Sequence, residues 1–127
     1  MMQYILHQLD FFKMCLRGRD FNRAWQGIVD LILHGANEAD VWSLDYTIAM
    51  LVLPRLKYFR DLNALGCSVQ YRMEEEHWQK IINKMILAME LVMQDCGNDG
   101  EPLTQKERAK QQEGLRLFGK YFRNLWY

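Results

Sequence analysis

The stretch Trp78-Gln-Lys-Ile81-Ile82-Asn-Lys-Met85-Ile86-Leu-Ala-Met89-Glu-Leu-Val92 decides the fold class of this chain. Its apolar residues recur at intervals of three and four positions, the spacing that places side chains on one face of an α-helix. The stripe consists of Trp78, Ile81, Ile82, Met85, Met89 and Val92. Three glutamates at positions 74–76 come just before it, where acidic residues stabilise the first turn of a helix. The stretch therefore predicts a long helix with one buried face.

Two further helices are predicted before the chain reaches residue 36. The first stops at Gly18, and the second begins after Asp20, a residue type that caps helix N-termini, and ends at His34-Gly35. Their predicted buried faces are Ile5, Leu9, Phe12 and Leu16 in the first, and Phe21, Ala24, Trp25, Ile28 and Ile32 in the second. The segment Asn37 to Val41 is expected to be a connector.

The third and last helices lie on either side of the central stretch. Pro54 interrupts the third helix, and because proline lacks an N–H we expect a kink there. Thr104 and Glu107 form a capping box for the last helix, after a predicted mobile loop at 97–103. The expected buried faces are Ile48, Leu51, Val52, Leu56, Phe59 and Leu62, and then Leu115, Phe118, Phe122 and Leu125. Gly114 and Gly119 would let another backbone approach the last helix closely.

These patterns predict an all-α fold, a single compact bundle of about five helices over residues 1–127. Of the 127 residues, 50% are hydrophobic, which is enough to form one core. Three cysteines are an odd number, which argues against a disulfide framework. The N-terminus lacks the pattern of a signal peptide, and the longest strongly apolar run, 46–54, is too short for a membrane helix. We therefore expect a soluble, intracellular protein without a membrane partner.

Charge argues against nucleic-acid binding by bulk attraction, because 16 basic residues balance 16 acidic ones. Basic residues do gather in the last helix, as Lys106, Arg108, Lys110, Arg116, Lys120 and Arg123. Nearby aromatic residues, Trp126 among them, have rings that can stack on bases. A nucleic-acid-associated protein that uses Lys120 and Arg123 is thus an alternative function. A solvated helix face is the simpler interpretation.

Catalytic and metal-binding patterns are incomplete. Glu74 and His77 have the spacing of one half of a di-iron site in a helical bundle, but the sequence offers no second half. The consecutive glutamates at 74–76 also lack the paired acidic turns of an all-α nucleotide pyrophosphatase, and no phosphate-binding loop is present. We assign no catalytic residue and expect no cofactor. A metal-dependent nucleotide hydrolase is the least favoured alternative.

The four tryptophans divide into two pairs. Trp25 and Trp78 fall on apolar stripes and are expected in the core. Trp42 lies just before a predicted helix and Trp126 is next to the last residue, so both are harder to bury completely. Aromatic residues at such edges are enriched at interfaces, and the same residues can equally cover an open end of the bundle.

Three blocks of the sequence resemble recurring segments of an uncharacterised family of small helical bacteriophage and prophage proteins. The first is Asp40-Val-Trp42-Ser-Leu44-Asp45 with Leu53-Pro54-Arg55-Leu56-Lys57, the second Glu75-Glu76-His-Trp78-x-x-Ile81-Ile82-x-Lys84-Met85-Ile86, and the third Glu113-Gly114-Leu115-x-Leu117-Phe118-x-x-Tyr121-Phe122-x-x-Leu125-Trp126. The resemblance leaves the first two helices outside the match. It implies a phage accessory protein in the host bacterial cytoplasm, and no particular activity.

We therefore expect a binding protein that occupies a host protein or sequesters a small anionic ligand, with counter-defence as one role in that class. Homo-oligomer formation stays open. Polar residues inside the blocks either form ion pairs between helices or, for Arg55, Lys57 and Lys84, line an anion pocket. The candidate ligand- or partner-binding residues are Trp42, Asp45, Arg55, Lys57, Lys84, Arg116, Lys120, Arg123 and Trp126.

Overall fold

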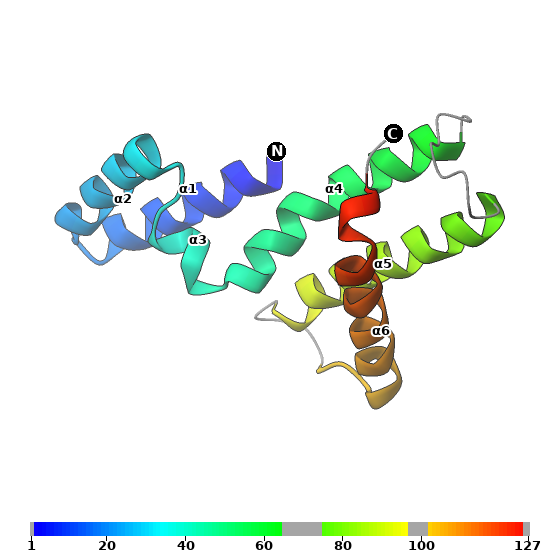
Figure 1. Cartoon of the computed structure of the whole chain (residues 1–127). Helices are drawn as coiled ribbons and strands as arrows, with labels where there is room; N and C mark the ends of the chain where they lie inside the picture. The colour runs from blue at the N-terminus through cyan, green and yellow to red at the C-terminus, as the bar shows by residue number, and fades with distance from the viewer. Residues whose placement is uncertain (1, 65–74, 97–101, 126–127) are drawn as a thin grey trace. The chain divides into compact units, whose positions relative to one another are not determined.

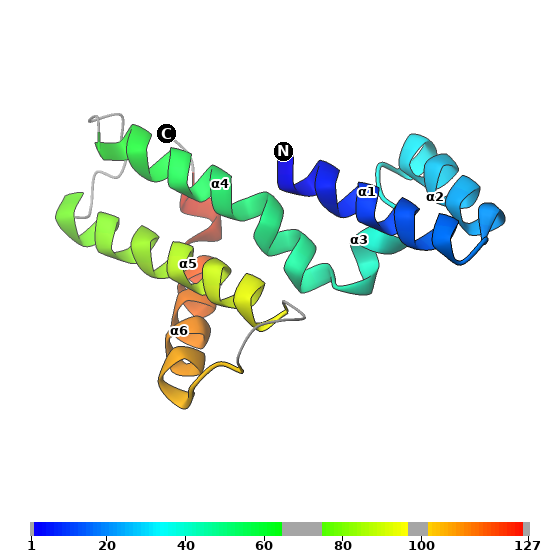
Figure 2. The ribbon, with the colours of Figure 1, turned by 180° about the vertical axis from the view of Figure 1, so that it is seen from behind.

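The computed structural model describes residues 2–64, 75–96 and 102–125, and in these ranges the chain is helical without strands. Figure 1 and Figure 2 show the helices from two opposite sides. The bounds are α1 Met2–Arg17, α2 Phe21–His34, α3 Glu38–Trp42, α4 Leu44–Ala64, α5 Glu75–Asp95 and α6 Gln105–Tyr121, followed by a 3-10 turn at Phe122–Asn124. The all-α prediction is confirmed. None of the helices in the described part of the chain has both the length and the apolar character that crossing a bilayer requires.

By its internal contacts the chain divides into two compact units, Met1–Ile48 and Ala49–Tyr127. The expectation of one domain over 1–127 stays a prediction, and each unit is described by itself below.

In the first unit, α1 and α2 form an antiparallel hairpin, and the short helix α3 packs on α1 (Figure 1). As predicted, α1 ends before Gly18 and Asp20 caps α2, with its carboxylate accepting from the Arg23 N–H at 3.0 Å. Gly35 ends α2 in the left-handed region, with a φ of 71° that suits glycine. The local signals in the sequence were therefore sufficient to predict the end of α1 and both ends of α2.

The segment expected to be a connector, Asn37 to Val41, is instead the start of α3, so that expectation was wrong. Asn37 accepts from the Ala39 N–H, and Asp40 accepts from the Asn37 N–H at 2.8 Å, a reciprocal cap that starts a new helix. Asparagine followed three residues later by aspartate was the signal in the sequence.

The predicted buried faces of α1 and α2 were also largely wrong, although Ala24 is buried as expected. The buried residues of α1 are Gln8, Phe11 and Cys15, whereas those of α2 are Ala24 and Gly27. The predicted stripes are largely exposed, including Ile5, Leu9, Leu16, Phe21, Ile28 and Ile32, and Trp25 is 67% exposed although it was expected in the core. The hairpin packs through its small residues: a Cβ added to Gly27 would lie 2.9 Å from the Phe11 ring. The Phe11 ring occupies the space that Gly27 leaves, and the large side chains of the predicted stripes are mostly exposed.

The second unit has the larger core, built around α5. Every residue of the central stripe, from Trp78 to Val92, is buried as predicted, and Trp78, Ile82 and Met85 are almost completely enclosed. Ala49 and Leu56 reach this core from α4 and Leu117 from α6. Helix α4 runs through Pro54 as one helix, and the kink there stays a prediction.

The predicted start of helix α6 is confirmed, whereas its predicted buried face was partly wrong. Thr104 and Glu107 cap each other as predicted. The buried residues are Gly114 and Leu117, whereas Leu115 is 39% and Phe122 62% exposed. The other two predicted residues, Phe118 and Leu125, are partly buried and pack against the core. Residues 97–101 of the predicted mobile loop lie outside the described residues, and Leu103 at its end is buried.

Candidate binding surface

A polar network fixes α3 against the α1–α2 hairpin of the first unit. Asp40 is 5% exposed and accepts hydrogen bonds from the Gln8 Nε2 at 2.9 Å and from the Asn37 backbone N–H. The Asn37 amide in turn donates to Gln8 Oε1 at 2.6 Å, and the Tyr4 hydroxyl reaches Asp40 at 3.4 Å. Burial and the nearby Asp40 raise the pKa of Tyr4 above its ordinary value. The buried carboxylate is thus satisfied by groups that position helices, so its role is structural.

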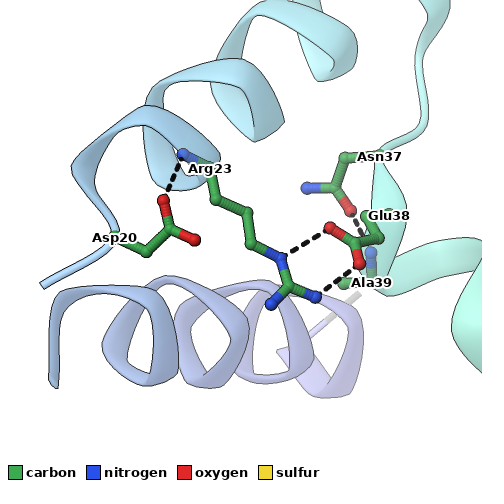
Figure 3. A network of polar contacts seen from close by, with 5 residues as sticks. All are labelled: Asp20, Arg23, Asn37, Glu38 and Ala39. Carbon is green, nitrogen blue, oxygen red and sulfur yellow. Dashed lines mark hydrogen bonds and ion pairs between the residues drawn. The ribbon is translucent and has the colours of Figure 1, made fainter. Parts of the chain in front are cut away.

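Arg23 makes a second set of contacts that joins helices of this unit (Figure 3). Its Nε donates to Glu38 at 2.7 Å and its terminal amine to the other carboxylate oxygen, a bidentate pair that joins α2 to α3. The hydrogen bonds from Arg23 hold the pKa of Glu38 below its ordinary value, and those to Glu38 raise the pKa of Arg23. The guanidinium also lies 5.9 Å from the centre of the Phe11 ring and 6.0 Å from that of Trp42. A hollow of about 330 Å³ beside the pair is lined in part by Arg23, Glu38 and Gly27.

Opposite these polar contacts the hairpin presents a bare apolar surface. We call it the N-terminal apolar face, consisting of Ile5, Leu9 and Leu16 on α1 and Phe21, Trp25, Ile28 and Ile32 on α2, all at least 40% exposed. A helix turns about 100° per residue. In both α1 and α2, the exposed stripe is therefore rotated about the helix axis by roughly a quarter turn from the buried residues, and the sense of rotation is the same in each helix. Because α1 and α2 run antiparallel, this offset brings both stripes to the same side of the hairpin. Arg23 precedes Ala24 and points to the other side, toward α3.

Several predicted binding residues turn out to join helices of the second unit. Lys57 pairs with Glu90 at 2.7 Å and joins α4 to α5, and Lys84 pairs with Glu113 at 2.7 Å and joins α5 to α6. The hydrogen bond from Lys84 lowers the pKa of Glu113, with a smaller contribution from Arg116. Of the two interpretations left open by the sequence, ion pairs between helices describe Lys57 and Lys84.

The remaining candidate binding residues that the structure describes are spread over α3, α4, α6 and the 3-10 turn after α6. Trp42 is 66% exposed, and Asp45, Arg116 and Arg123 are exposed as well. The Lys120 ammonium lies 5.0 Å from the ring centre of its neighbour Tyr121. Arg55 lines a groove and donates to the carbonyl of Leu51 in its own helix. Trp126 lies outside the described residues, and nucleic-acid binding by the basic residues of α6 stays a prediction.

The candidate metal residues do not form a site in the described part of the chain. His77 is exposed, and Glu74 lies outside the described residues. Within residues 2–64, 75–96 and 102–125, no group of three or more histidine, cysteine or acidic side chains is placed to share a metal ion.

Sequence reasoning missed two features of the first unit, the Arg23–Glu38 pair and the exposure of the apolar face. Arg23 stood out only as one of three arginines near the first turn, and its pairing with Glu38 depends on where α3 lies. The apolar face was read as core because helical periodicity cannot distinguish a buried stripe from an exposed one. The small residues Ala24 and Gly27, one and two positions from Trp25, were the available signal for the true contact.

Comparison with known proteins adds no constraint on this assignment. No protein-family model, no curated protein and no solved structure matches the chain.

Proposed function

We propose that this protein is a non-catalytic binding protein that holds a partner protein on the N-terminal apolar face. The observation that carries the proposal is the exposure of Trp25, at 67%, in one stripe with Ile28 and Ile32. Contiguous apolar patches on a soluble protein are typical of interaction sites, and tryptophan is the residue type most enriched among those that dominate binding energy. The face supplies such an anchor on a rigid helix.

The apolar contacts of the face are comparable in free energy to the cost of association. Fully burying one large apolar side chain contributes roughly 1.5–3 kcal/mol, and those of the face are about half exposed, so we take about 1 kcal/mol for each. Seven such side chains and a matching partner surface would give on the order of 14 kcal/mol. Association costs roughly 4–15 kcal/mol, which leaves a balance that depends on the fit of the partner. The face alone therefore favours a specific, shape-matched partner.

A membrane surface is the competing occupant, and the charges of α2 argue against it. Helices that lie on membranes carry many lysines and arginines opposite the apolar side. Helix α2 has one arginine, Arg23, which pairs with Glu38, and one aspartate, Asp30. Helix α1 adds Lys13, which pairs with Asp10 at 3.4 Å, and Arg17, so the two helices carry few basic residues. A protein partner is the better match. The phage-like blocks lead us to propose that the partner is a host bacterial protein, met in the host cytoplasm.

Site-specific photocrosslinking in bacterial cells tests the proposal. A crosslinking residue at position 25 should capture one partner that the same residue at position 26 does not, because Gln26 is exposed but lies off the apolar face. The purified partner should then bind the native protein in vitro. Trp25→Glu should abolish that binding, whereas Gln26→Glu, which adds the same charge one residue away, should leave it intact.

Two outcomes would contradict the proposal. Equal capture at positions 25 and 26 would remove the face as the binding surface. Capture of a second copy of this chain at position 25 would replace the partner protein with a homo-oligomer. Circular dichroism of both variants checks that the helices are intact, which is expected because neither side chain is buried.

A further inference from the structure

The second unit contains a groove that the proposed function does not use. We call it the Arg55 groove, with a volume of about 570 Å³ and a lining of Val52, Arg55, Leu56, Tyr58, Phe59 and Leu62 from α4, Phe118 from α6, and Leu125. Its volume falls within the roughly 300–1,000 Å³ typical of small-molecule sites. Among these lining residues the polar side-chain groups are the Arg55 guanidinium and the Tyr58 hydroxyl, so an occupant would meet an apolar groove with polar groups at one place.

Arg55 is the charged member of this lining, and none of the carboxylates of the described residues neutralises it. The side chain donates to the carbonyl of Leu51, which uses one of its five N–H groups, and no carboxylate pairs with it among the described residues. Lys57, two residues along the same helix, shows the contrast, because Glu90 pairs with it at 2.7 Å. The ion pairs that join helices in this unit therefore leave the groove's own cation available.

Two aromatic side chains of the lining, Phe118 and Tyr58, remain at least partly accessible. Phe118 packs edge-on against Phe122, with ring centres 5.6 Å apart, and is only partly buried. Tyr58 is 67% exposed, so its hydroxyl can donate to a ligand. A guanidinium binds a carboxylate with two parallel hydrogen bonds, a geometry that a single hydroxyl or amide does not supply. Charge and wall together select an occupant with an anionic head and an apolar tail.

We propose that the Arg55 groove binds a single-chain aliphatic carboxylate, with its head on Arg55 and its tail along Leu56, Phe59 and Phe118. The site is independent of the N-terminal apolar face and does not rest on the function proposed for it. Of the three residues predicted from the sequence to hold an anion, only Arg55 takes part, because Lys57 and Lys84 are paired with Glu90 and Glu113.

Isothermal titration of the full chain with acetate, hexanoate and decanoate tests the tail. Each buried methylene contributes about 0.8 kcal/mol, so affinity should rise about fourfold per methylene until the groove is filled, with one decanoate bound per chain. Equal affinity for acetate and decanoate would show that no tail is bound. Failure of decanoate to bind at millimolar concentration, or non-saturating binding of many molecules, would overturn the proposal.

A pair of variants tests the head. Arg55→Gln should weaken decanoate binding about tenfold, the value of a charge-assisted hydrogen bond, and should leave binding of decan-1-ol unchanged. Lys57→Gln removes a cation from the same helix and should change the affinity for neither decanoate nor decan-1-ol. Unchanged decanoate affinity in Arg55→Gln would overturn the assignment of the head. Sedimentation of Arg55→Gln at a lower mass than the native chain would mean that the groove is an interface between copies instead.

Discussion

A single methyl group added at position 114 should push helices α5 and α6 apart. A Cβ added to Gly114 would lie 2.5 Å from the Cβ of Ala88 and closer still to the backbone carbonyl of Lys84. Ordinary contacts at a Cβ are 3.4–4 Å long, so the helices would have to separate by about 1 Å. The clash with the Lys84 carbonyl is with backbone, which cannot rotate away as a side chain can.

The magnitude follows from two opposing contributions. Alanine is favoured over glycine inside a helix by about 1 kcal/mol. Overpacking a core costs typically 1–3 kcal/mol, and a contact with backbone belongs at the upper end or beyond. We therefore expect Gly114→Ala to lower the free energy of unfolding by about 2 kcal/mol. Gly119 lies in the same helix with no atom within 4 Å of an added Cβ among the described residues, so Gly119→Ala should raise it by up to about 1 kcal/mol.

Urea unfolding followed by far-UV circular dichroism measures both variants against the native chain. The expected signature is opposite signs for the same substitution five residues apart in one helix. Both values carry the same change in helix propensity, so their difference, about 3 kcal/mol, isolates the steric contact. If Gly114→Ala were as stable as Gly119→Ala, the close approach of α5 and α6 at this glycine would be refuted.

Three further predictions test other parts of the structure. Thr104→Ala removes the cap of α6 and should cost about 1 kcal/mol in the same unfolding assay, whereas an unchanged midpoint would mean that the cap is not formed. Lys84 lowers the pKa of Glu113 below its usual 4.5, so this carboxylate stabilises the fold above that pH and the stabilisation is lost as pH falls through the lower, folded pKa. Acid unfolding of Glu113→Gln should therefore start from a lower stability at neutral pH and depend less steeply on pH, and an unaltered profile would contradict the ion pair. Finally, Trp25→Gln should change the free energy of unfolding by less than about 0.5 kcal/mol, whereas Trp78→Ala should lower it by about 3–5 kcal/mol. For the same reason, iodide should quench the fluorescence of the exposed Trp25 but not that of the buried Trp78. Protection of Trp25 from iodide in the monomer would contradict the exposed face.

The candidate sites were only partly accessible to sequence reasoning. Arg55 was singled out because its block carries charges that packing does not demand, and the structure places it in a groove. Its companion Lys57 was indistinguishable in the sequence, because what separates the two is the position of Glu90 on another helix. The N-terminal apolar face could not be identified from residue spacing, since a stripe has the same spacing whether it is covered or not.

Local chemistry determined the helices and most of their ends. Asp20, Gly35, the Thr104–Glu107 capping box and the stripe from Trp78 to Val92 act within a few residues of their own position, so the sequence alone sufficed for them. The reciprocal cap of Asn37 and Asp40 is a local signal of the same kind for the start of α3.

Tertiary structure decided which side of α1, α2 and α6 is buried. The hairpin of α1 and α2 closes on Ala24 and Gly27, and α5 meets α6 at Gly114, because backbones approach most closely where side chains are smallest. Trp25 and Phe122 are exposed, although their apolar character alone would place them inside. Burial depends on which surfaces meet, and that is a property of pairs of helices that no single stretch of sequence contains.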